Sequence, residues 1–409
     1  MIHLNSSSKT KFLAVIFLAV FLDMLGVTII IPVIPALFEG KHAMFSGFSV
    51  PTRSLLYGLL IGCYSIMQFI GSPVLGALSD RFGRKAILSI SLIGSFIGYA
   101  MFGYAITENI IWLLFFARII PGFMGGNIAV IYSSIADISS DDEKIKNFGL
   151  VGSAFGLGFI IGPGIGGVLA DNNVVSWFTY ATPFWFTAIL TLINIILIQF
   201  FFPETLKIRN KRKVSLLTGL HNLKKIVLIP NLRNLLFLVF LVSLGFTFYT
   251  EFYSVHLFRK YQYKVNNIGI LFLWIGVCLV LAQSVIVRIL SKRYLPKQVL
   301  RWSLLFLGSF IVLLLFCEKS WQIYLMNALI ALAFGMTSPN LTGLVSNNAT
   351  ANQQGEILGI NQSVISLAQV LPPLIGGVLL GIDSIYPILT GGLVCMLAAI
   401  LFLLRKRYN

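Results

Sequence analysis

Charged residues are scarce in this 409-residue chain. Asp, Glu, Lys and Arg make up 11% of it and hydrophobic residues 57%, whereas a typical soluble domain is about 25% charged. The polar stretches between the hydrophobic runs are too short to form a soluble domain of their own. A packed soluble core cannot bury this much apolar surface. The composition therefore excludes a soluble globular protein and predicts one embedded in lipid.

Cysteine and histidine are also rare, at four residues each. Their spacing matches neither a zinc site nor a disulfide framework, and the sequence contains no H-E-x-x-H pair and no G-x-x-x-x-G-K-[ST] phosphate loop. A G-x-G-x-x-G pattern at Gly162, Gly164 and Gly167 lies inside an apolar run without a preceding strand, so it does not indicate dinucleotide binding. We therefore expect no metal, no other cofactor, no enzyme activity and no use of ATP by this chain.

Acidic residues are outnumbered by basic ones, 14 to 30, which gives a formal net charge of +16. The basic residues lie in short loops between apolar runs rather than on a solvated face, so we do not expect nucleic-acid binding. Membrane proteins concentrate Lys and Arg in their cytoplasmic loops. Placing both termini in the cytoplasm puts most of these residues inside, including the Lys207 to Lys213 cluster, Lys224, Lys225 and the tail from Arg405 to Arg407. This pattern predicts a multi-pass protein of the cell membrane, specifically a bacterial inner membrane.

Long hydrophobic runs recur along the whole chain. About 20 helical residues cross the roughly 30 Å hydrocarbon core of a bilayer, and the runs lack the alternating pattern of a barrel strand. We therefore predict an all-α polytopic membrane protein with twelve transmembrane helices. Their expected ranges are Phe12–Phe38, Leu55–Leu78, Ala86–Ala105, Ile110–Ala136, Phe148–Leu169, Pro183–Phe202, Leu235–Phe258, Ile268–Leu290, Val299–Phe316, Trp321–Val345, Ile357–Leu380 and Ile385–Leu404.

The longest polar loop divides the predicted spans into two sets of six. It predicts an N-terminal bundle over residues 1–202, a cytoplasmic linker over 203–233 and a C-terminal bundle over 234–409. Short sequence segments of the first half recur in the second half with lower similarity. Leu78–Lys85 aligns with Leu290–Lys297, and Gly166–Leu169 aligns with Gly376–Leu379. Duplicated six-helix units are typical of secondary transporters, which bind their substrates between the halves near the membrane midplane. The sequence thus predicts two pseudo-symmetric six-helix bundles.

Three motifs resemble those of the major facilitator superfamily, and most closely its twelve-span drug:proton antiporters, the group of the tetracycline exporters. Gly76-Ala-Leu-Ser-Asp-Arg-Phe-Gly-Arg-Lys85 is similar to the signature loop between spans 2 and 3. Gly158–Gly167 is similar to the span-5 antiporter motif, and Asp23-Met-Leu-Gly26 to a span-1 motif of drug exporters. The span-4 motif matches in part, since Pro121 stands where the family usually has glutamine. The resemblance implies the twelve-helix fold of that superfamily.

Three ionisable residues stand out as candidates inside the predicted spans, where a charge costs at least about 2.5 kcal/mol and indicates function. Asp23 lies about 16 Å into span 1 and Arg118 about 12 Å into span 4, at 1.5 Å per residue. Burial disfavours the charged form of Asp23 and a nearby cation favours it, so this residue is a candidate for proton coupling. The alternative is a structural ion pair between Asp23 and Arg118 that holds spans 1 and 4 together. Glu251, about 24 Å along span 7, either marks the outer interface or helps to bind a cationic substrate among neighbouring aromatic residues.

The resemblance also implies a conformational latch at the loop after span 2. In this interpretation Asp80 lies near the N-terminal end of span 11, where a carboxylate is stabilised by the helix dipole, and Arg84 lies near Asp137 at the inner end of span 4. The alternative is that the basic residues only set topology. The predicted latch residues are Gly76, Asp80, Arg81, Gly83, Arg84, Lys85 and Asp137.

Small and amide side chains mark two further candidate features. The span-5 motif residues Gly158, Gly162, Pro163, Gly166 and Gly167 would let helices approach closely and bend, which serves either a conformational role or ordinary tight packing. Among the intramembrane amides, the candidates for lining a cavity are Gln68, Asn127, Asn361 and Gln362. Each amide could instead form a helix–helix hydrogen bond of about 0.6 kcal/mol.

These observations predict a secondary active transporter, with proton-coupled export of a small amphipathic or drug-like molecule by alternating access. The proton is the expected coupling ion, and a monomer in the bilayer is the expected state. The alternative is a carrier for a nutrient, metabolite or siderophore, because the loop after span 2 is shared by importers and exporters. A membrane enzyme, a channel and a receptor are disfavoured.

Overall fold

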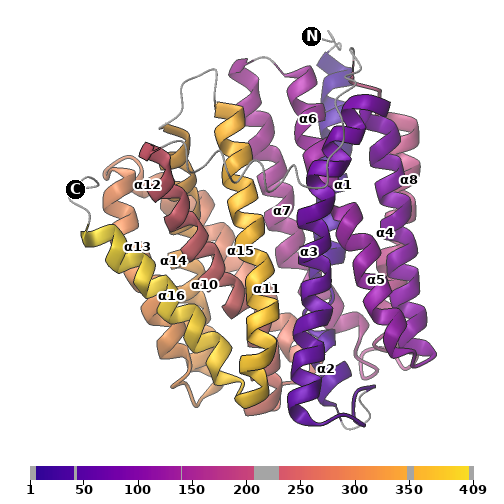
Figure 1. Cartoon of the computed structure of the whole chain (residues 1–409), viewed down its shortest axis with the longest axis vertical. Helices are drawn as coiled ribbons and strands as arrows, with labels where there is room; N and C mark the ends of the chain where they lie inside the picture. Colours follow the sequence, from indigo (N-terminus) through magenta and orange to yellow (C-terminus); the bar gives the residue numbers. More distant parts are fainter. Residues whose placement is uncertain (1–5, 41–43, 140, 207–229, 348–353, 405–409) are drawn as a thin grey trace. The chain divides into compact units, whose positions relative to one another are not determined.

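The computed structural model describes residues 6–40, 44–139, 141–206, 230–347 and 354–404. Within these ranges the regular structure is entirely helical (Figure 1), and twelve helices are long and apolar enough to cross a membrane. The predicted fold class and number of spans are therefore confirmed. The Lys207 to Lys213 cluster, Lys224, Lys225 and the basic tail, on which the predicted orientation depends, lie outside the described residues.

The helices of the first six spans are α1 (Ser6–Thr28), α2 (Val33–Glu39), α3 (Val50–Phe82), α4 (Arg84–Thr107), α5 (Ile111–Met124), the 3-10 turn η1 (Gly125–Asn127), α6 (Ile128–Ile138), α7 (Asp141–Leu169) and α8 (Thr182–Phe201). Those of the last six are α10 (Pro230–Tyr261), α11 (Val265–Leu281), the π-helical turn η2 (Ala282–Ile286), α12 (Val287–Leu290), α13 (Pro296–Leu314), α14 (Ser320–Asn347), α15 (Gln354–Ile382) and α16 (Ile385–Leu404).

The chain divides into two compact units. Unit 1 comprises Met1–Phe45, Cys63–Gly219 and Val265–Ile270, and unit 2 comprises Ser46–Gly62, Leu220–Lys264 and Leu271–Asn409. Unit 1 contains most of the first six spans, and unit 2 contains most of the last six. This division differs from the predicted domain boundaries at α3, whose first part groups with unit 2, and at α11, whose first residues group with unit 1.

Helices of unit 1 bury one face in the core and expose a second face that is also apolar. Inside the unit, α1 packs against α7 and α8, and α4 packs against α5 and α8. Aromatic pairs help to fill this core: the ring centroids of Phe12 and Phe202 are 5.0 Å apart, and those of Phe102 and Phe184 are 4.3 Å apart. Ile90, Ile93 and Ile97 are exposed at helical spacing along α4. Lipid accepts such a face, which explains why these helices are hydrophobic nearly all round.

Two spans that were predicted as continuous helices are broken. In span 1, α1 ends at Thr28 and α2 begins at Val33, because Pro32 has no backbone N–H to continue the helix. In span 4, the turn η1 separates α5 from α6. Two consecutive glycines, Gly125 and Gly126, favour a break there because glycine has low helix propensity. Both breaks lie next to candidate functional residues.

Candidate functional site

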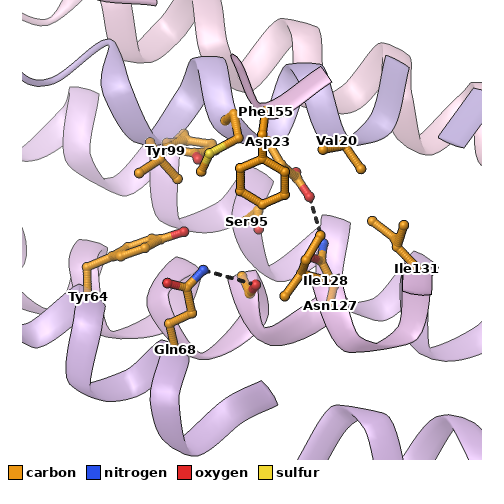
Figure 2. Close-up of a pocket in the computed structure, with 13 residues that line it drawn as sticks. Val20, Asp23, Tyr64, Gln68, Ser95, Tyr99, Asn127, Ile128, Ile131 and Phe155 are labelled. Atoms are coloured by element: carbon orange, nitrogen blue, oxygen red, sulfur yellow. Dashed lines mark hydrogen bonds between the residues drawn. The ribbon is translucent and has the colours of Figure 1, made fainter. Parts of the chain in front are cut away.

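A small cavity in unit 1 surrounds the carboxylate of Asp23 (Figure 2). Its volume is about 20 Å³, which is room for a water molecule rather than for a drug-sized ligand. Five helical segments contribute to it: α1, α3, α4, α7 and the joint between η1 and α6. The lining residues are Val20, Asp23, Met24, Val27, Tyr64, Gln68, Ser95, Tyr99, Gly125, Asn127, Ile128, Ile131 and Phe155.

Asp23 is held by an amide. The Nδ2 atom of Asn127 donates a hydrogen bond of 2.8 Å to Oδ2 of Asp23, and the Asn127 side chain is buried (Figure 2). Asp23 and Asn127 were both predicted from the sequence, but as separate features. The structural alternative for Asp23 was an ion pair with Arg118. The guanidinium carbon of Arg118 lies 4.6 Å from the ring centroid of Tyr64, in a cation–π contact.

The break in span 4 places Asn127 beside Asp23. The carbonyl oxygen of Gly125, within the break, accepts a 3.2 Å hydrogen bond from Nε2 of Gln68 on α3. A Cβ at Gly126 would collide with the backbone of Ser72, and one at Gly122 would lie 2.7 Å from the carbonyl oxygen of Tyr64. The backbone of α3 is therefore in direct contact with the end of α5 and with the break, which requires glycine at Gly122 and Gly126.

The span-5 glycines pack against α1 on either side of Asp23. A Cβ at Gly158 would lie 2.6 Å from Cβ of Met24, and one at Gly166 would collide with the carbonyl oxygen of Ile29. The hydroxyl of Thr28 donates a 3.1 Å hydrogen bond to the carbonyl oxygen of Gly158. A Cβ at Gly162 would collide with the hydroxyl oxygen of Thr28. The close helix approach expected from this motif is thus present between α1 and α7.

The last part of the span-5 motif meets a different helix. Gly167 and the carbonyl oxygen of Pro163 face Gly269, near the start of α11, and a Cβ at Gly167 would lie 3.0 Å from Cα of Gly269. Pro163 lies inside α7. The motif therefore contacts both α1 and the first turns of α11, all within unit 1.

Arg84 is the centre of the predicted latch. Its Nη1 atom lies 2.6 Å from Oδ1 of Asp80 and donates to Oγ of Ser79 at 2.6 Å, while its Nε donates to Oδ2 of Asp137 at 3.1 Å. The Arg84 side chain is buried. The structure thus brings together Arg84 and Asp137, as the resemblance implied. The approach of Asp80 to span 11 stays a prediction.

The other predicted latch residues surround this cluster. Arg81 packs its guanidinium over the ring of Phe82, at 5.1 Å from the centroid. Nζ of Lys85 donates a 2.7 Å hydrogen bond to the carbonyl oxygen of Gln199 on α8. Gly76 makes an ordinary contact, since a Cβ there would lie 3.6 Å from Cβ of Ala129.

Glu204 joins this cluster of side chains and was not predicted from the sequence. Its Oε1 and Oε2 atoms accept hydrogen bonds from the backbone N–H groups of Arg84 (2.9 Å) and Lys85 (3.2 Å), the first residues of α4. Gly83, with φ of 111°, passes so close to this carboxylate that a Cβ would collide with it. The hydroxyl of Thr205 donates to Oδ2 of Asp137 at 3.1 Å. Glu204 is a single acidic residue directly after span 6, in an otherwise basic loop. This isolated negative charge could have marked it as a candidate partner for basic or N–H groups.

Replacing Glu204 with alanine is expected to lower the free energy of unfolding by about 1 kcal/mol, because two N–H groups at a helix N-terminus lose their acceptor. Glu204→Gln should have an intermediate effect, since it keeps one acceptor oxygen but loses the charge. Thermal unfolding in detergent measures both. Glu108→Ala is the matched control, since Glu108 is exposed at the opposite end of α4. Equal stability of Glu204→Ala and Glu108→Ala would contradict the assignment.

Glu251 lies inside span 7 and in unit 2. The structure extends this span to Tyr261, so Glu251 is ten residues, or about 15 Å, from its C-terminal end. Its neighbours Tyr249 and Tyr253 are buried and hydrogen-bond to Asn327 of α14. Phe252 packs on Tyr57, whose hydroxyl donates to the Glu251 carbonyl oxygen at 2.8 Å. The aromatic neighbours are thus engaged in packing within unit 2, and a role of Glu251 in substrate binding stays a prediction.

Of the four predicted cavity amides, Gln68 and Asn127 line the cavity around Asp23. Asn361 and Gln362 lie on α15 in unit 2, where Asn361 is buried and Gln362 is exposed. Four lining residues with polar or aromatic side chains were not predicted: Tyr64, Ser95, Tyr99 and Phe155. Tyr64 precedes Gln68 by four residues on α3, so the shared helix face of the two was the available signal.

Sequence comparisons relate this chain to known proteins. The chain is 29% identical to a class H tetracycline resistance protein of Pasteurella multocida over 397 residues, covering 96% of this chain and 94% of that protein. It is also 29% identical to the quinolone resistance protein NorA of Staphylococcus aureus (strain MSSA476) over 404 residues, covering 98% and 97%.

Solved structures share the fold at lower identity. The human organic anion transporter MFSD10 (TETRAN) superposes with a TM-score of 0.72 at 22% identity, covering 96% of this chain and 99% of that one. A D-xylose–proton symporter superposes with a TM-score of 0.73 at 16% identity, covering 96% and 97%. The sequence model of the Major Facilitator Superfamily matches residues 16–296 and 235–409. This chain therefore belongs to the Major Facilitator Superfamily and is a membrane transporter rather than an enzyme.

Proposed function

We propose that this protein is a proton-coupled exporter of small amphipathic or drug-like molecules that works by alternating access. The observation that carries the proposal is Asp23, a carboxylate inside span 1 that borders a water-sized cavity and is hydrogen-bonded by Asn127 at the break in span 4. A carboxylate is kept within a membrane span, despite its cost, when it binds an ion or a proton. The relatives named as tetracycline and quinolone resistance proteins support export over uptake.

In this proposal Asp23 binds a proton from the outside and releases it to the cytoplasm, while substrate moves outward. The proton is the coupling ion, and no other cofactor takes part. The glycine contacts between α1 and α7 place the helix that carries Asp23 directly against the span-5 motif. A change in the charge of Asp23 therefore acts on a closely packed helix pair, which can rock as a body.

The location proposed for the protein is a bacterial inner membrane, with both termini in the cytoplasm. The excess of basic over acidic residues and its distribution in the loops support this orientation. We propose a monomer that binds a small molecule and lipid, and no nucleic acid.

Flux measurements in proteoliposomes test the function. Tetracycline and a quinolone serve as probes, and a pH gradient is imposed or collapsed with an ionophore. We expect probe movement against its concentration gradient only while the pH gradient is present, with proton flux in the opposite direction. Probe movement that ignores the pH gradient would contradict proton coupling. Probe and protons moving in the same direction would favour the alternative, an uptake carrier for a nutrient, metabolite or siderophore.

A further inference from the structure

The hydrogen bond between Asn127 and Asp23 is strongest when Asp23 is ionised. In the structure Nδ2 of Asn127 donates to Oδ2 of Asp23 at 2.8 Å. An ionised carboxylate only accepts hydrogen bonds, whereas a protonated carboxyl keeps a weaker acceptor oxygen and gains an O–H that needs an acceptor when it is buried. If Asp23 binds and releases a proton, its surroundings must offer a donor to the carboxylate and an acceptor to the new O–H.

A side-chain amide can supply both. It carries an N–H₂ donor and a carbonyl acceptor on one planar group, and half a turn about its terminal bond exchanges their places. We propose that Asn127 is a positioning residue that reverses its amide when Asp23 gains or loses its proton. The inference rests on the proposed role of Asp23 as the coupling carboxylate. It adds Asn127 as the group whose orientation responds to the protonation state of Asp23.

The surroundings confine the response to the Asn127 side chain and to the break that carries it. The backbone at Gly126 is pressed against Ser72, and Gln68 holds the carbonyl oxygen of Gly125 at 3.2 Å. Asn127 is 2% exposed, so bulk water does not replace its lost hydrogen bonds. Reversal of the amide therefore presents the opposite dipole to η1. Protonation on α1 is in this way transmitted to the joint between α5 and α6.

Other polar groups lie near Asp23 on the helices packed around it. Tyr64 of α3 and Tyr99 of α4 line the same cavity and lie within electrostatic reach of the carboxylate. Arg118 of α5 lies over the face of Tyr64. The α7 residue that lines the cavity is Phe155, which is apolar, and Ser95 of α4 is a neutral hydroxyl. Asn127 is the group whose hydrogen bond to Asp23 the structure describes.

Infrared difference spectra of the purified protein in lipid vesicles, titrated with pH, test the inference without any transported substrate. The carboxyl band that disappears in Asp23→Asn reports protonation of Asp23, and asparagine labelled at the side-chain carbonyl reports the amide. We expect the amide carbonyl band to shift at the same pH as the Asp23 band. In Asn127→Leu, the Asp23 midpoint should move to higher pH by about one unit, because hydrogen bonds to ionised groups are about twice as strong as neutral ones.

Asn194→Leu is the matched control. Asn194 is a buried amide of α8 in the same unit, and its side-chain atoms have no hydrogen-bond partner in the part of the chain that the structure describes. Its removal should leave the Asp23 midpoint unchanged. An equal midpoint in wild type and Asn127→Leu would overturn the inference, since a role in packing alone does not move it.

Two further outcomes decide against the inference even if Asn127→Leu fails to fold. A labelled amide band in the wild type that stays constant while Asp23 titrates excludes reversal. Wild-type spectra without any band that Asp23→Asn removes would show that Asp23 does not change its protonation state. In contrast, if these bands behave as expected but probe flux ignores the pH gradient, the transport proposal fails and the assignment of Asn127 stands.

Discussion

Asp23→Asn is expected to reduce pH-driven probe transport to the level of protein-free liposomes. The substitution keeps the size of the side chain and an oxygen that can accept the hydrogen bond from Nδ2 of Asn127. It removes the ability of the side chain to bind and release a proton. The pH gradient then cannot drive transport through this residue. The rate of probe uptake in proteoliposomes, with and without an imposed pH gradient, measures the effect.

The same variant should fold normally. Because the amide contact is retained and a buried charge is removed, the midpoint of thermal unfolding should stay at or above that of the wild type. Exchange of probe down its own gradient should also persist, since substrate binding need not require the carboxylate. Retention of full gradient-driven uptake in Asp23→Asn would assign proton coupling to another residue, and Glu251 of unit 2 would be the next candidate.

The second large effect is expected where α7 contacts Ile29, the residue directly after α1. Gly166→Ala should destabilise the protein by about 1–3 kcal/mol, because the added Cβ collides with the backbone carbonyl of Ile29 and neither helix can yield without moving the other. Since α1 carries Asp23, transport should fall together with stability. Thermal unfolding and probe flux of the purified variant measure the two effects.

The same helix supplies the matched control. Gly152 and Gly156 of α7 have no atom within 4 Å of an added Cβ. Gly156→Ala should therefore be neutral or stabilise the protein by up to about 1 kcal/mol, because alanine has the higher helix propensity. If Gly166→Ala were as stable and active as Gly156→Ala, the span-5 motif would not depend on close packing against α1.

The sequence predicted the candidate site in separate parts. Asp23 and Arg118 were found because an ionisable residue in an apolar run is rare, and depth along two helices suggested that they could pair. Their actual contacts depend on the break in span 4, where Gly125 and Gly126 turn Asn127 toward Asp23. Hydropathy does not report such a break, since the run from Ile110 to Ala136 reads as one continuous apolar segment.

The latch shows the same limit. The resemblance carried Arg84, which belongs to the signature loop after span 2, and Asp137, which it placed near Arg84 at the inner end of span 4. Glu204 could not be found in that way, since it lies 120 residues from Arg84 in sequence and directly after Pro203, where the apolar run ends. It was placed in the linker, whereas the structure packs it against Gly83 and the first turn of α4.

The amino-acid sequence by itself determined that this protein is helical, crosses a membrane twelve times and keeps a carboxylate in its first span. These properties depend on whether each segment lies in lipid or in water. The composition of a segment and the length of its apolar run indicate this directly. Only the tertiary structure decided the partners: Asn127 for Asp23, Tyr64 for Arg118, and Glu204 for the start of α4. Partners depend on where helices break and which faces then meet, and these are set by contacts between segments that lie far apart in the chain.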